Sequence, residues 1–489
     1  MNLTSALATS VEQHSAKIAI YWGDSEITYG HIWNQSRWMA AQLRDNFGVK
    51  PGDRVGIWLK NCPEFIPAIF GILLTGATVV PINNFLKPDE VTHVLNDGGI
   101  DVLISEQVLS EAFPKLQGAR PGLKTFEVEN MQATPSDSAP KESPRAKDDL
   151  AVIIYTSGTT GKPKGAMLSH GNLLANVESC RQVLEAVAFD RFVVLLPMFH
   201  SFMLCVCIFL PMTVGGSIVL VKSLHPPKNI VADIFRRQAS ILPAIPPLFR
   251  ALANAQFPGE LPLRLCISGA APLPGEILRE WNSRFNIPLI EGYGLSEASP
   301  VVSINPIRGP WKAGSIGVPI ANVEVTVQDE EGKILKDGEV GEICVRGGNV
   351  MQGYWNKPDE TAKALRNGWL LTGDVGYRDP DGYFFITDRK KDMLLVNGIN
   401  VYPREIEEII YTFPGIKEAA VISRPDERKG EQPVAYVALN EGATLNEKEL
   451  IHYLRERLAD YKVPRQINVL PALPRNATGK ILKTALRAQ

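Results

Sequence analysis

The sequence predicts an α/β protein in which a large N-terminal domain of doubly wound mixed sheets carries a small β-rich subdomain and precedes a small α+β C-terminal domain. The length of 489 residues exceeds what one hydrophobic core organises. Asp53 to Leu59, Pro63 to Leu74 and Ala77 to Ile82 follow a strand, helix, strand order, which is typical of a parallel doubly wound sheet. The last stretch, of roughly 100 residues, is long enough for an independent domain.

Individual elements follow from local patterns. Ile18 to Tyr21 and Glu26 to Tyr29 are expected to pair as a hairpin around Gly23-Asp24. Residues 131–149 are rich in Ser, Pro, Lys and Asp and predict a surface linker, which leads into a buried strand at Ala151 to Tyr155. The β-rich subdomain is expected at Ile316 to Pro319 and Gly338 to Gly353, and the C-terminal elements are expected as helices at Arg404 to Tyr411 and Glu447 to Leu458 and strands at Ile416 to Ser423, Pro433 to Leu439 and Gln466 to Leu470.

The composition is that of an ordinary soluble globular protein, with 45% hydrophobic and 21% charged residues. The 51 basic and 53 acidic residues nearly cancel, so no nucleic-acid partner is expected and anion binding must be local. The six cysteines are scattered in mostly apolar surroundings, which favours buried free thiols in a reducing compartment over a zinc site. Because the N-terminal stretch lacks the pattern of a secretory signal, a cytoplasmic location is expected.

One segment is long and apolar enough to require weighing as a membrane span. Phe199 to Val221 contains no Asp, Glu, Lys or Arg. His200, Pro211 and Gly215-Gly216 interrupt it, so a buried helix and strand is the favoured interpretation. The sequence therefore predicts no membrane span, while a peripheral membrane contact stays open.

The strand at Ala151 to Tyr155 is followed by a loop with the composition of a polyphosphate cradle. Glycines let backbone N–H groups approach an anion, and hydroxyl and ammonium groups add donors. A Walker A loop is excluded because Lys162 precedes Pro163, where that pattern requires Ser or Thr; the alternative is a surface turn with solvated lysines. A helix is expected to begin near Ser169. The candidate phosphate-binding residues are Thr156, Ser157, Gly158, Thr159, Thr160 and Lys164.

Two later strands also end in glycine-containing loops. Leu265 to Ile267 leads into Ser268 to Leu273, and Pro288 to Ile290 leads into Glu291 to Glu297. Ligands of open α/β sheets bind beyond the carboxyl ends of strands, so these loops are candidate ligand contacts. Each alone is also typical of an ordinary tight turn.

Together these motifs resemble the adenylate-forming superfamily, which holds acyl-CoA synthetases, aryl-CoA ligases, luciferases and the adenylation domains of peptide synthetases. The resemblance extends from about Thr28 to Lys480 and implies ATP, Mg²⁺ and CoA as substrates and cofactors. It implies adenine and acyl contacts near Gly269, a stacking tyrosine, an α-phosphate hydroxyl and two ribose contacts. In chain order the implied ATP-site residues are Gly269, Ala270, Ala271, Gly292, Tyr293, Gly294, Ser296, Asp374 and Arg389.

The same resemblance assigns the metal and the acid. It implies that Glu297 binds Mg²⁺, and one carboxylate suits an ion that completes its shell with phosphate oxygens and water. It implies that His200 orients the substrate carboxylate, although a lone histidine beside an apolar run is more often a core residue. Asp374 follows Trp369 to Gly373 and is expected on a turn after a strand. The implied acyl pocket contains Phe199, Phe202 and Met203.

The C-terminal motifs imply a mobile domain. The resemblance places the hinge at Lys391, dividing the chain into an ATP- and acyl-binding domain at 1–390 and a mobile domain at 391–489. Gly398 is implied to leave room for the pantetheine arm of CoA, although Asn397 departs from the expected Ser or Gly. Lys480 is implied to be catalytic, because a cation offsets the negative charge that gathers when a carboxylate attacks the α-phosphate. Without the resemblance, a solvated lysine is the favoured interpretation of Lys480.

The predicted activity is that of an AMP-forming acyl-CoA synthetase acting on a medium- or long-chain fatty acid. An aryl acid such as cinnamate or benzoate is the second choice, since Met and Phe adapt to flat rings. Transfer of the acyl group to a carrier protein and a catalytically silent nucleotide-binding protein are the further alternatives. The sequence leaves chain length, pathway and a homodimer open.

Overall fold

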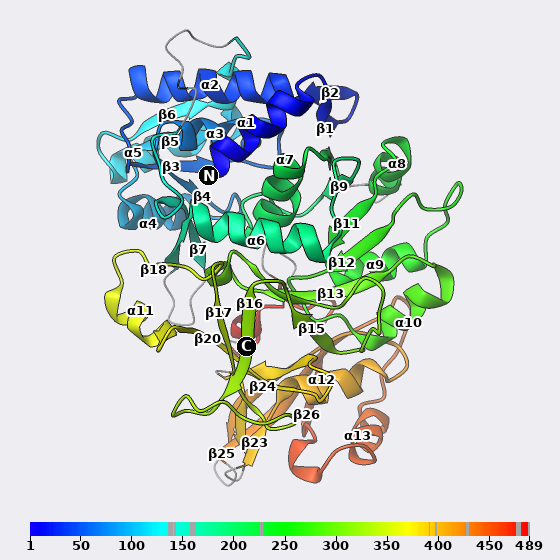
Figure 1. The fold of residues 1–489 in the computed structure, drawn as a ribbon. Helices are drawn as coiled ribbons and strands as arrows, with labels where there is room; N and C mark the ends of the chain where they lie inside the picture. The colour runs from blue at the N-terminus through cyan, green and yellow to red at the C-terminus, as the bar shows by residue number, and fades with distance from the viewer. Residues whose placement is uncertain are drawn as a thin grey trace.

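A computed structural model describes residues 1–134, 140, 143–156, 163–224, 226, 228–390, 392–396, 399–426, 430–475 and 481–487. Two large sheets and their helices form most of the molecule, and the C-terminal elements gather at one end (Figure 1). The C-terminal part has its own cluster of buried apolar side chains, which runs from Leu394 to Ile467. The division after residue 390 stays a prediction.

The first sheet carries the predicted phosphate loop. Its order is β18-β8-β7-β4-β3-β5-β6, with β7, β4, β3, β5 and β6 parallel and β8 and β18 antiparallel to their neighbours. The predicted strands at Asp53 to Leu59 and Ala77 to Ile82 are present as β3 and β4. The strands are β3 (Arg54–Trp58), β4 (Thr78–Pro81), β5 (Val102–Ser105), β6 (Lys124–Glu127), β7 (Leu150–Thr156), β8 (Lys164–Ser169) and β18 (Gly353–Tyr354).

The second sheet has 14 strands in the order β16-β17-β20-β21-β15-β14-β13-β12-β11-β9-β10-β1-β2, with β19 beside β20. The run from β10 to β13 is parallel, and the strands from β14 to β16 are antiparallel, so the predicted β-rich subdomain continues this sheet. The strands are β1 (Ile18–Trp22), β2 (Ser25–Thr28), β9 (Arg191–Val194), β10 (Ser217–Leu220), β11 (Ile241–Ala244), β12 (Leu265–Ser268), β13 (Leu289–Gly294), β14 (Val301–Ile304), β15 (Ser315–Pro319), β16 (Val323–Gln328), β17 (Gly341–Gly347), β19 (Leu365–Arg366), β20 (Trp369–Arg378) and β21 (Phe384–Arg389).

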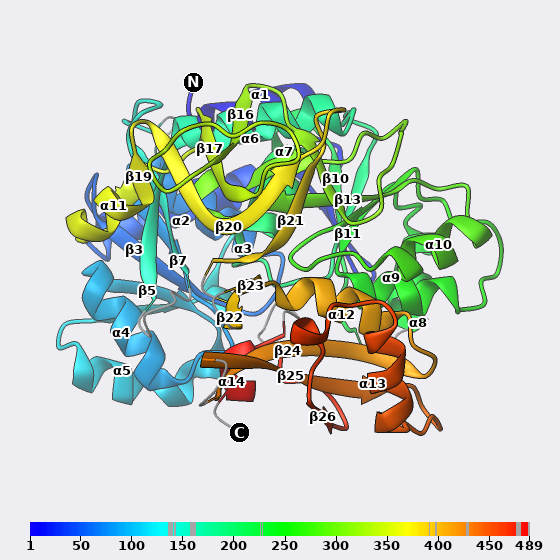
Figure 2. The ribbon, with the colours of Figure 1, turned by 90° about the horizontal axis from the view of Figure 1, so that it is seen from below.

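The C-terminal part contains the third sheet, of five strands. Viewed from below, it lies in front of the larger part, with α12 next to β21 (Figure 2). The predicted elements of this part are present, with ends that differ by a few residues. They are β22 (Leu394–Val396), β23 (Ile399–Val401), α12 (Pro403–Tyr411), β24 (Ile416–Asp426), β25 (Gly430–Leu439), α13 (Glu447–Arg455), β26 (Gln466–Val469) and α14 (Lys483–Arg487).

Helices cover the two large sheets. α3 is apolar throughout and all its residues are buried, as expected of a helix inside a large domain. α6 begins after Ser169 as predicted, because the Ser169 side chain accepts a hydrogen bond from Asn172 N. The helices before α12 are α1 (Leu3–His14), α2 (Tyr29–Asp45), α3 (Phe65–Leu74), α4 (Pro88–Gly98), α5 (Phe113–Ala119), α6 (His170–Val183), α7 (Leu210–Val214), α8 (Lys228–Arg236), α9 (Pro246–Ala253), α10 (Gly275–Arg284) and α11 (Pro358–Ala364).

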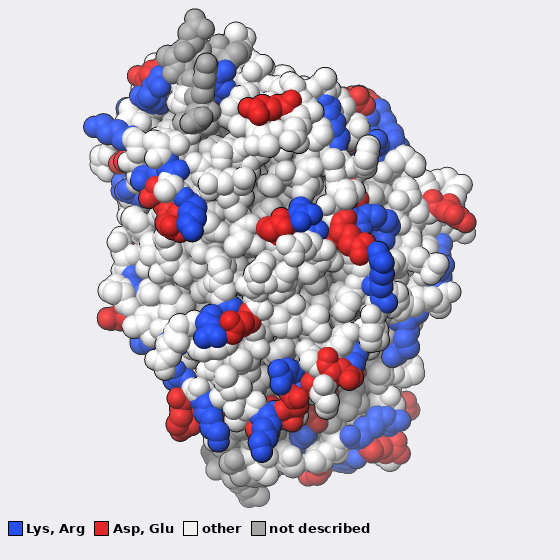
Figure 3. All heavy atoms as spheres, viewed as in Figure 1, with Lys and Arg blue, Asp and Glu red and all other residues white. Residues whose placement is uncertain are grey.

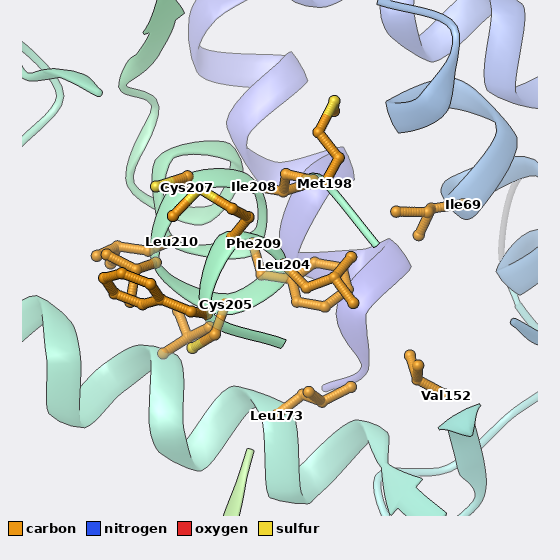
Figure 4. Close-up of a cluster of buried hydrophobic side chains, with 14 of the residues drawn as sticks. Ile69, Val152, Leu173, Met198, Leu204, Cys205, Cys207, Ile208, Phe209 and Leu210 are labelled. Atoms are coloured by element: carbon orange, nitrogen blue, oxygen red, sulfur yellow. The ribbon is translucent and has the colours of Figure 1, made fainter. Parts of the chain in front are cut away.

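The segment weighed as a membrane span is part of the core. It forms a buried π-helix, η3 (Met203–Phe209), followed by α7 and β10. Figure 4 shows η3 with its side chains packed near Leu173 of α6, Ile69 of α3 and Val152 of β7. Among the described residues, no helix has both the length and the apolar character needed to cross a bilayer.

The charged side chains and the cysteines are distributed as the sequence predicts, with mixed charges on the surface and mostly buried free thiols. On the face in Figure 3, basic and acidic side chains are scattered singly and in small mixed groups. All six cysteines are free thiols; Cys62 is partly exposed and the other five are buried. Burial raises the pKa of the Cys207 and Cys266 thiols.

Candidate active site

The predicted phosphate loop connects two antiparallel strands. Thr156 ends β7 and Lys164 begins β8, and the two residues pair across the ladder, with Thr156 Oγ1 donating to the Lys164 carbonyl at 3.4 Å. The strand β8 was not predicted and separates the loop from α6. Ser157, Gly158, Thr159 and Thr160 lie outside the described residues, so their predicted contacts stay predictions.

The ammonium group of Lys164 has two neighbours. It forms an ion pair with Glu360 of α11, whose other carboxylate oxygen lies 2.9 Å from Lys363 Nζ. The two ammonium groups hold the pKa of Glu360 at about 2. Lys164 Nζ also lies 5.2 Å from the ring centroid of Tyr354, within the range of a cation–π contact.

Tyr354 extends this cluster to the predicted metal ligand. Its hydroxyl donates to Glu297 Oε1 at 2.8 Å, and Glu297 lies in a 3₁₀ turn, η4 (Ser296–Ala298). Burial and the neighbouring Glu297 carboxylate raise the pKa of Tyr354, so its hydroxyl remains a donor. Tyr354 and Glu360 were not among the predicted site residues. Tyr354 lies between Gly353 and Trp355, and Glu360 is one of two acidic residues in the first turn of α11, so neither has a local signal for these contacts.

The described residues fit a metal that is held largely by its nucleotide. Among them, no group of three or more His, Cys, Asp or Glu side chains is placed to hold an ion. Mg²⁺ in nucleotide sites takes one or two carboxylates together with phosphate oxygens and water. Glu297 is half-buried and keeps Oε2 as an acceptor, so it suits that role.

The predicted ribose contacts form a second cluster on neighbouring strands. Asp374 of β20 faces Arg389 of β21 in the antiparallel ladder, with Arg389 Nε 3.0 Å from Asp374 Oδ1. Tyr293 at the end of β13 donates its hydroxyl to Asp374 Oδ2 at 2.5 Å. Burial raises the pKa of Tyr293. The expectation that Asp374 lies on a turn is wrong: it lies within β20, where the cross-strand partner fixes its position.

The residues predicted to face the acid lie where the two glycine loops meet η3. Ser201 Oγ and Ser296 Oγ are 3.1 Å apart, which joins the segment after His200 to the predicted α-phosphate contact. A Cβ at Gly269 would lie 3.1 Å from the Phe202 ring, so glycine permits this close approach. Burial lowers the pKa of His200 to about 4, so the imidazole is neutral at pH 7. Phe199 and Met203 are buried beside these residues, and Ala270 and Ala271 follow Gly269 half-buried.

Gly292 and Gly294 flank Tyr293 in β13, and only Gly294 is sterically required. A Cβ at Gly294 would lie 2.2 Å from the Pro300 carbonyl oxygen, whereas one at Gly292 would make only ordinary contacts. Gly294 therefore holds the strand end against the turn that carries Ser296 and Glu297. This fixes the side chains of β13 relative to η4.

A hydrogen bond joins β21 to the start of α12 shortly before and after the predicted hinge in the chain. Asp388 of β21 accepts hydrogen bonds from the backbone N–H groups of Arg389 at 2.7 Å and Arg404 at 3.0 Å. Lys483 of α14 lies 2.8 Å from Glu407 of α12. The predicted hinge residue Lys391, the predicted CoA-side Gly398 and the predicted catalytic Lys480 lie outside the described residues.

Comparison with known proteins decides the family. The family described as AMP-binding enzyme matches residues 7–355, and the AMP-binding enzyme C-terminal domain matches residues 405–480. The chain belongs to the AMP-binding enzyme family. The predicted membership of the adenylate-forming superfamily and the predicted fold class are therefore confirmed.

Members of this family with different named substrates are about equally similar to the chain. A long-chain-fatty-acid–CoA ligase of Bacillus subtilis (strain 168) is 34% identical over 528 residues, covering 99% of this chain and 94% of the relative. A feruloyl-CoA synthase of an Amycolatopsis species is 35% identical over 477 residues, covering 96% of this chain and 95% of the relative. Overall identity therefore does not separate aliphatic from aromatic acids.

Solved structures of one family member differ in how well they match. ATP-bound MatB from Rhodopseudomonas palustris gives a TM-score of 0.91 at 31% identity, covering 100% of this chain and 99% of that chain. The apo form of MatB from the same organism gives 0.79 at 30% identity, with the same coverage. The overall arrangement of this chain is therefore closer to that of the ATP-bound form.

Proposed function

We propose that this AMP-binding enzyme activates a carboxylic acid with ATP to acyl-AMP and transfers the acyl group to CoA, and that the acid is a medium- or long-chain fatty acid. The observation that carries the proposal is the convergence of Lys164, Glu297 and the Tyr293–Asp374 pair around loops next to His200 and Phe202. Cationic, metal-binding and ribose-binding groups thereby meet an apolar wall. An acid and ATP need such a combination.

In the first step the acid attacks the α-phosphate, and pyrophosphate leaves. Lys164 and the hydroxyls of Thr156, Ser157, Thr159 and Thr160, with Gly158, hold the phosphates, while Ser296 donates to the α-phosphate. Asp374 accepts the ribose hydroxyls and Arg389 adds a donor. Mg²⁺ held by Glu297 offsets charge on the phosphate oxygens when bound. Lys480 stabilises the charge that develops in the transition state.

His200 contributes as a neutral group. Because burial holds its pKa at about 4, the imidazole donates or accepts a hydrogen bond at pH 7 without adding a charge. It therefore orients the substrate carboxylate and separates it from solvent without neutralising it. The carboxylate keeps its nucleophilic charge.

In the second step the C-terminal part rotates about Lys391, which withdraws Lys480 and brings the loop at Gly398 to the acyl-AMP for attack by the thiol of CoA. The TM-scores of 0.91 to ATP-bound MatB and 0.79 to apo MatB support an arrangement suited to the first step. The division at 1–390 and 391–489 is part of this proposal. No described helix can span a bilayer, and a cytoplasmic location is proposed from the sequence.

The apolar wall favours an aliphatic or aromatic acid over a charged one. Phe199, Phe202 and Met203 are buried, and each buried methylene of a ligand is worth about 0.8 kcal/mol. The fatty-acid ligase relative supports an aliphatic chain. The feruloyl-CoA synthase relative supports an aryl acid as the second candidate.

The test is AMP release by the purified enzyme with Mg·ATP and CoA across short to long fatty acids, with cinnamate, ferulate and benzoate in the same panel. A maximum at one aliphatic length is expected. Turnover of aryl acids alone would move the enzyme to the aryl-CoA ligases, and AMP release that ignores CoA would indicate another acceptor. Absence of ATP–pyrophosphate exchange with every acid would contradict the adenylation step itself.

A further inference from the structure

The segment from Met351 to Thr361 contacts both groups that the proposed function assigns to the phosphates and the metal. Its Met351 N–H donates to the Glu297 carbonyl at 2.8 Å, and its Trp355 N–H donates to the Gly165 carbonyl at 2.8 Å. β18 within it pairs with β8, the strand that Lys164 begins. The segment is therefore fixed to both sides of the site by its backbone.

Two side chains of this segment reach the functional groups themselves. Tyr354 donates to Glu297 with its hydroxyl and places its ring under Lys164, while Glu360 forms the ion pair with Lys164. Among the described residues, Glu360 is the one carboxylate within ion-pair distance of Lys164. Lys164, which is proposed to bind the phosphates, is therefore paired with a protein carboxylate in this structure.

The two partners of this ion pair differ in what remains when the pair separates. Glu360 keeps a second cation, because Lys363 Nζ lies 2.9 Å from its Oε1. Within the described ranges, Lys164 keeps the Tyr354 ring, which attracts a cation more weakly than a carboxylate or phosphate does. Another anion can also reach Lys164, because 17% of the Lys164 side chain and 29% of the Glu360 side chain are accessible to solvent.

We propose that Glu360 is the resting counter-ion of Lys164, which the polyphosphate of Mg·ATP displaces and which recovers Lys164 when pyrophosphate leaves. Lys363 neutralises Glu360 while Lys164 is on the nucleotide. Tyr354 keeps Lys164 over its ring and Glu297 in hydrogen-bond contact during the exchange. Glu360 is thus a positioning residue that opposes polyphosphate binding.

Competition and simple support predict opposite changes in ligand affinity when Glu360 is neutralised. If Glu360 competes with phosphate for Lys164, its neutralisation makes Mg·ATP and pyrophosphate bind more tightly and makes pyrophosphate leave more slowly. If Glu360 only holds Lys164 in the correct place, its neutralisation weakens both ligands. Ion pairs that are partly exposed to solvent have modest strength, so a change of about 2- to 5-fold is expected.

The experiment measures binding of Mg·ATP, and separately of Mg·pyrophosphate, to the full-length enzyme by calorimetry without any acid. Glu360→Gln is expected to lower both Kd values about 2- to 5-fold. Asp359→Asn is the matched control, because Asp359 lies in the same first turn of α11, is exposed and makes no ion pair among the described residues. This control is expected to leave both Kd values unchanged.

The remaining outcomes overturn the inference. An unchanged or higher Kd in Glu360→Gln shows that Glu360 does not compete for Lys164, provided that the thermal midpoint of the variant matches the wild type. An equal fall in Asp359→Asn shows a general effect of surface charge. The inference rests on the proposed function, and the two fail separately: wild-type enzyme that binds no Mg·ATP contradicts the proposed function, whereas normal wild-type binding with an unaltered Glu360→Gln contradicts only the inference.

Discussion

The two sides of the proposed nucleotide site are built differently. On the ribose side, the Asp374 side chain is 5% exposed and is held by Tyr293 and Arg389 from adjoining strands. On the phosphate side, Lys164 and Glu360 are more accessible, and Glu360 belongs to a helix of one to two turns, α11. The ribose side is prearranged by a sheet, whereas the phosphate side is made of contacts that can exchange partners.

The difference matches what each side must do in a reaction that releases pyrophosphate and keeps AMP. A buried carboxylate that two side chains already hold in place loses little on binding the ribose, and it holds the nucleotide while the acyl group is transferred. An ion pair that is partly exposed to solvent adds little stability and is easily replaced. The rigid ribose side thus binds AMP, which stays through the first step, and the exchangeable phosphate side binds pyrophosphate, which leaves.

The largest expected effect comes from breaking the rigid side. Asp374→Ala leaves Arg389 and the Tyr293 hydroxyl without their carboxylate and removes the proposed ribose acceptor. Loss of one partner from a buried charge pair costs about 2 kcal/mol or more, so kcat/KM for ATP in ATP–pyrophosphate exchange should fall about 30-fold or more. Asp337→Ala, which breaks the exposed pair with Arg378 at the other end of β20, should change it less than about 2-fold. Equal losses in both variants would remove the distinction between the two sides.

A smaller effect is expected from the link between the phosphate and metal groups. Tyr354→Phe keeps the ring under Lys164 and removes the donor to Glu297 Oε1. Loss of a partner that orients a metal ligand typically weakens metal binding about 10-fold, so the Mg²⁺ concentration for half-maximal exchange should rise by about that factor at fixed ATP. Tyr377→Phe, from the stacked Tyr377–Phe385 pair, is the control. An unaltered Mg²⁺ dependence in Tyr354→Phe would separate Tyr354 from the metal site.

A third prediction concerns Glu291, a buried carboxyl group on the ribose side of the site. It lies in β13 two residues before Tyr293, accepts a hydrogen bond from Leu273 N at 3.1 Å, and burial raises its pKa to about 7. The folded state therefore binds more protons than the unfolded state between about pH 4.5 and 7, and stability falls as pH rises through that window. Glu291→Gln cannot ionise, so its thermal midpoint relative to wild type should rise from pH 5 to pH 8, by roughly 2 °C. A constant difference at all pH values would show that folding leaves the pKa of Glu291 unchanged.

The smallest expected effect concerns His200. With its pKa lowered to about 4 by burial, the imidazole is neutral from pH 5.5 to 8. The pH profile of acyl-AMP formation should therefore have the same shape in wild type and in His200→Gln, although the rates differ. A loss of wild-type activity near pH 6.5 that disappears in the variant would show that His200 titrates during adenylation.

Much of the fold and the family could be predicted from sequence because strands, helix caps and glycine loops are local patterns. Ser169 caps α6 as predicted, and the hairpin around Gly23 forms between β1 and β2. The position of Asp374 was wrong because Thr372-Gly373 has the local character of a turn, while the ladder with β21 keeps the residue within a strand. That ladder is a tertiary contact without a local signal.

The phosphate-side cluster could not be predicted for the same reason. Lys164 and Glu360 are 196 residues apart in the chain and meet only because β18 pairs with β8. In the sequence, Glu360 is one of many acidic residues near the start of a helix, and Tyr354 is an aromatic residue between Gly353 and Trp355. Their proximity to Lys164 and Glu297 could be seen only once the pairing of β18 with β8 was known.

The π-helix η3 has a consequence for how the substrate range of this enzyme changes in evolution. Met203 is a predicted acyl-pocket residue, and it and the other six residues of η3 are buried in the central core. A mutation that lengthens the pocket also opens a cavity in that core, at a cost of about 24 cal/mol per Å³. Selection for a longer acid and selection for heat tolerance therefore act in opposite directions on the same side chains, so a shift in chain length requires a stabilising mutation elsewhere.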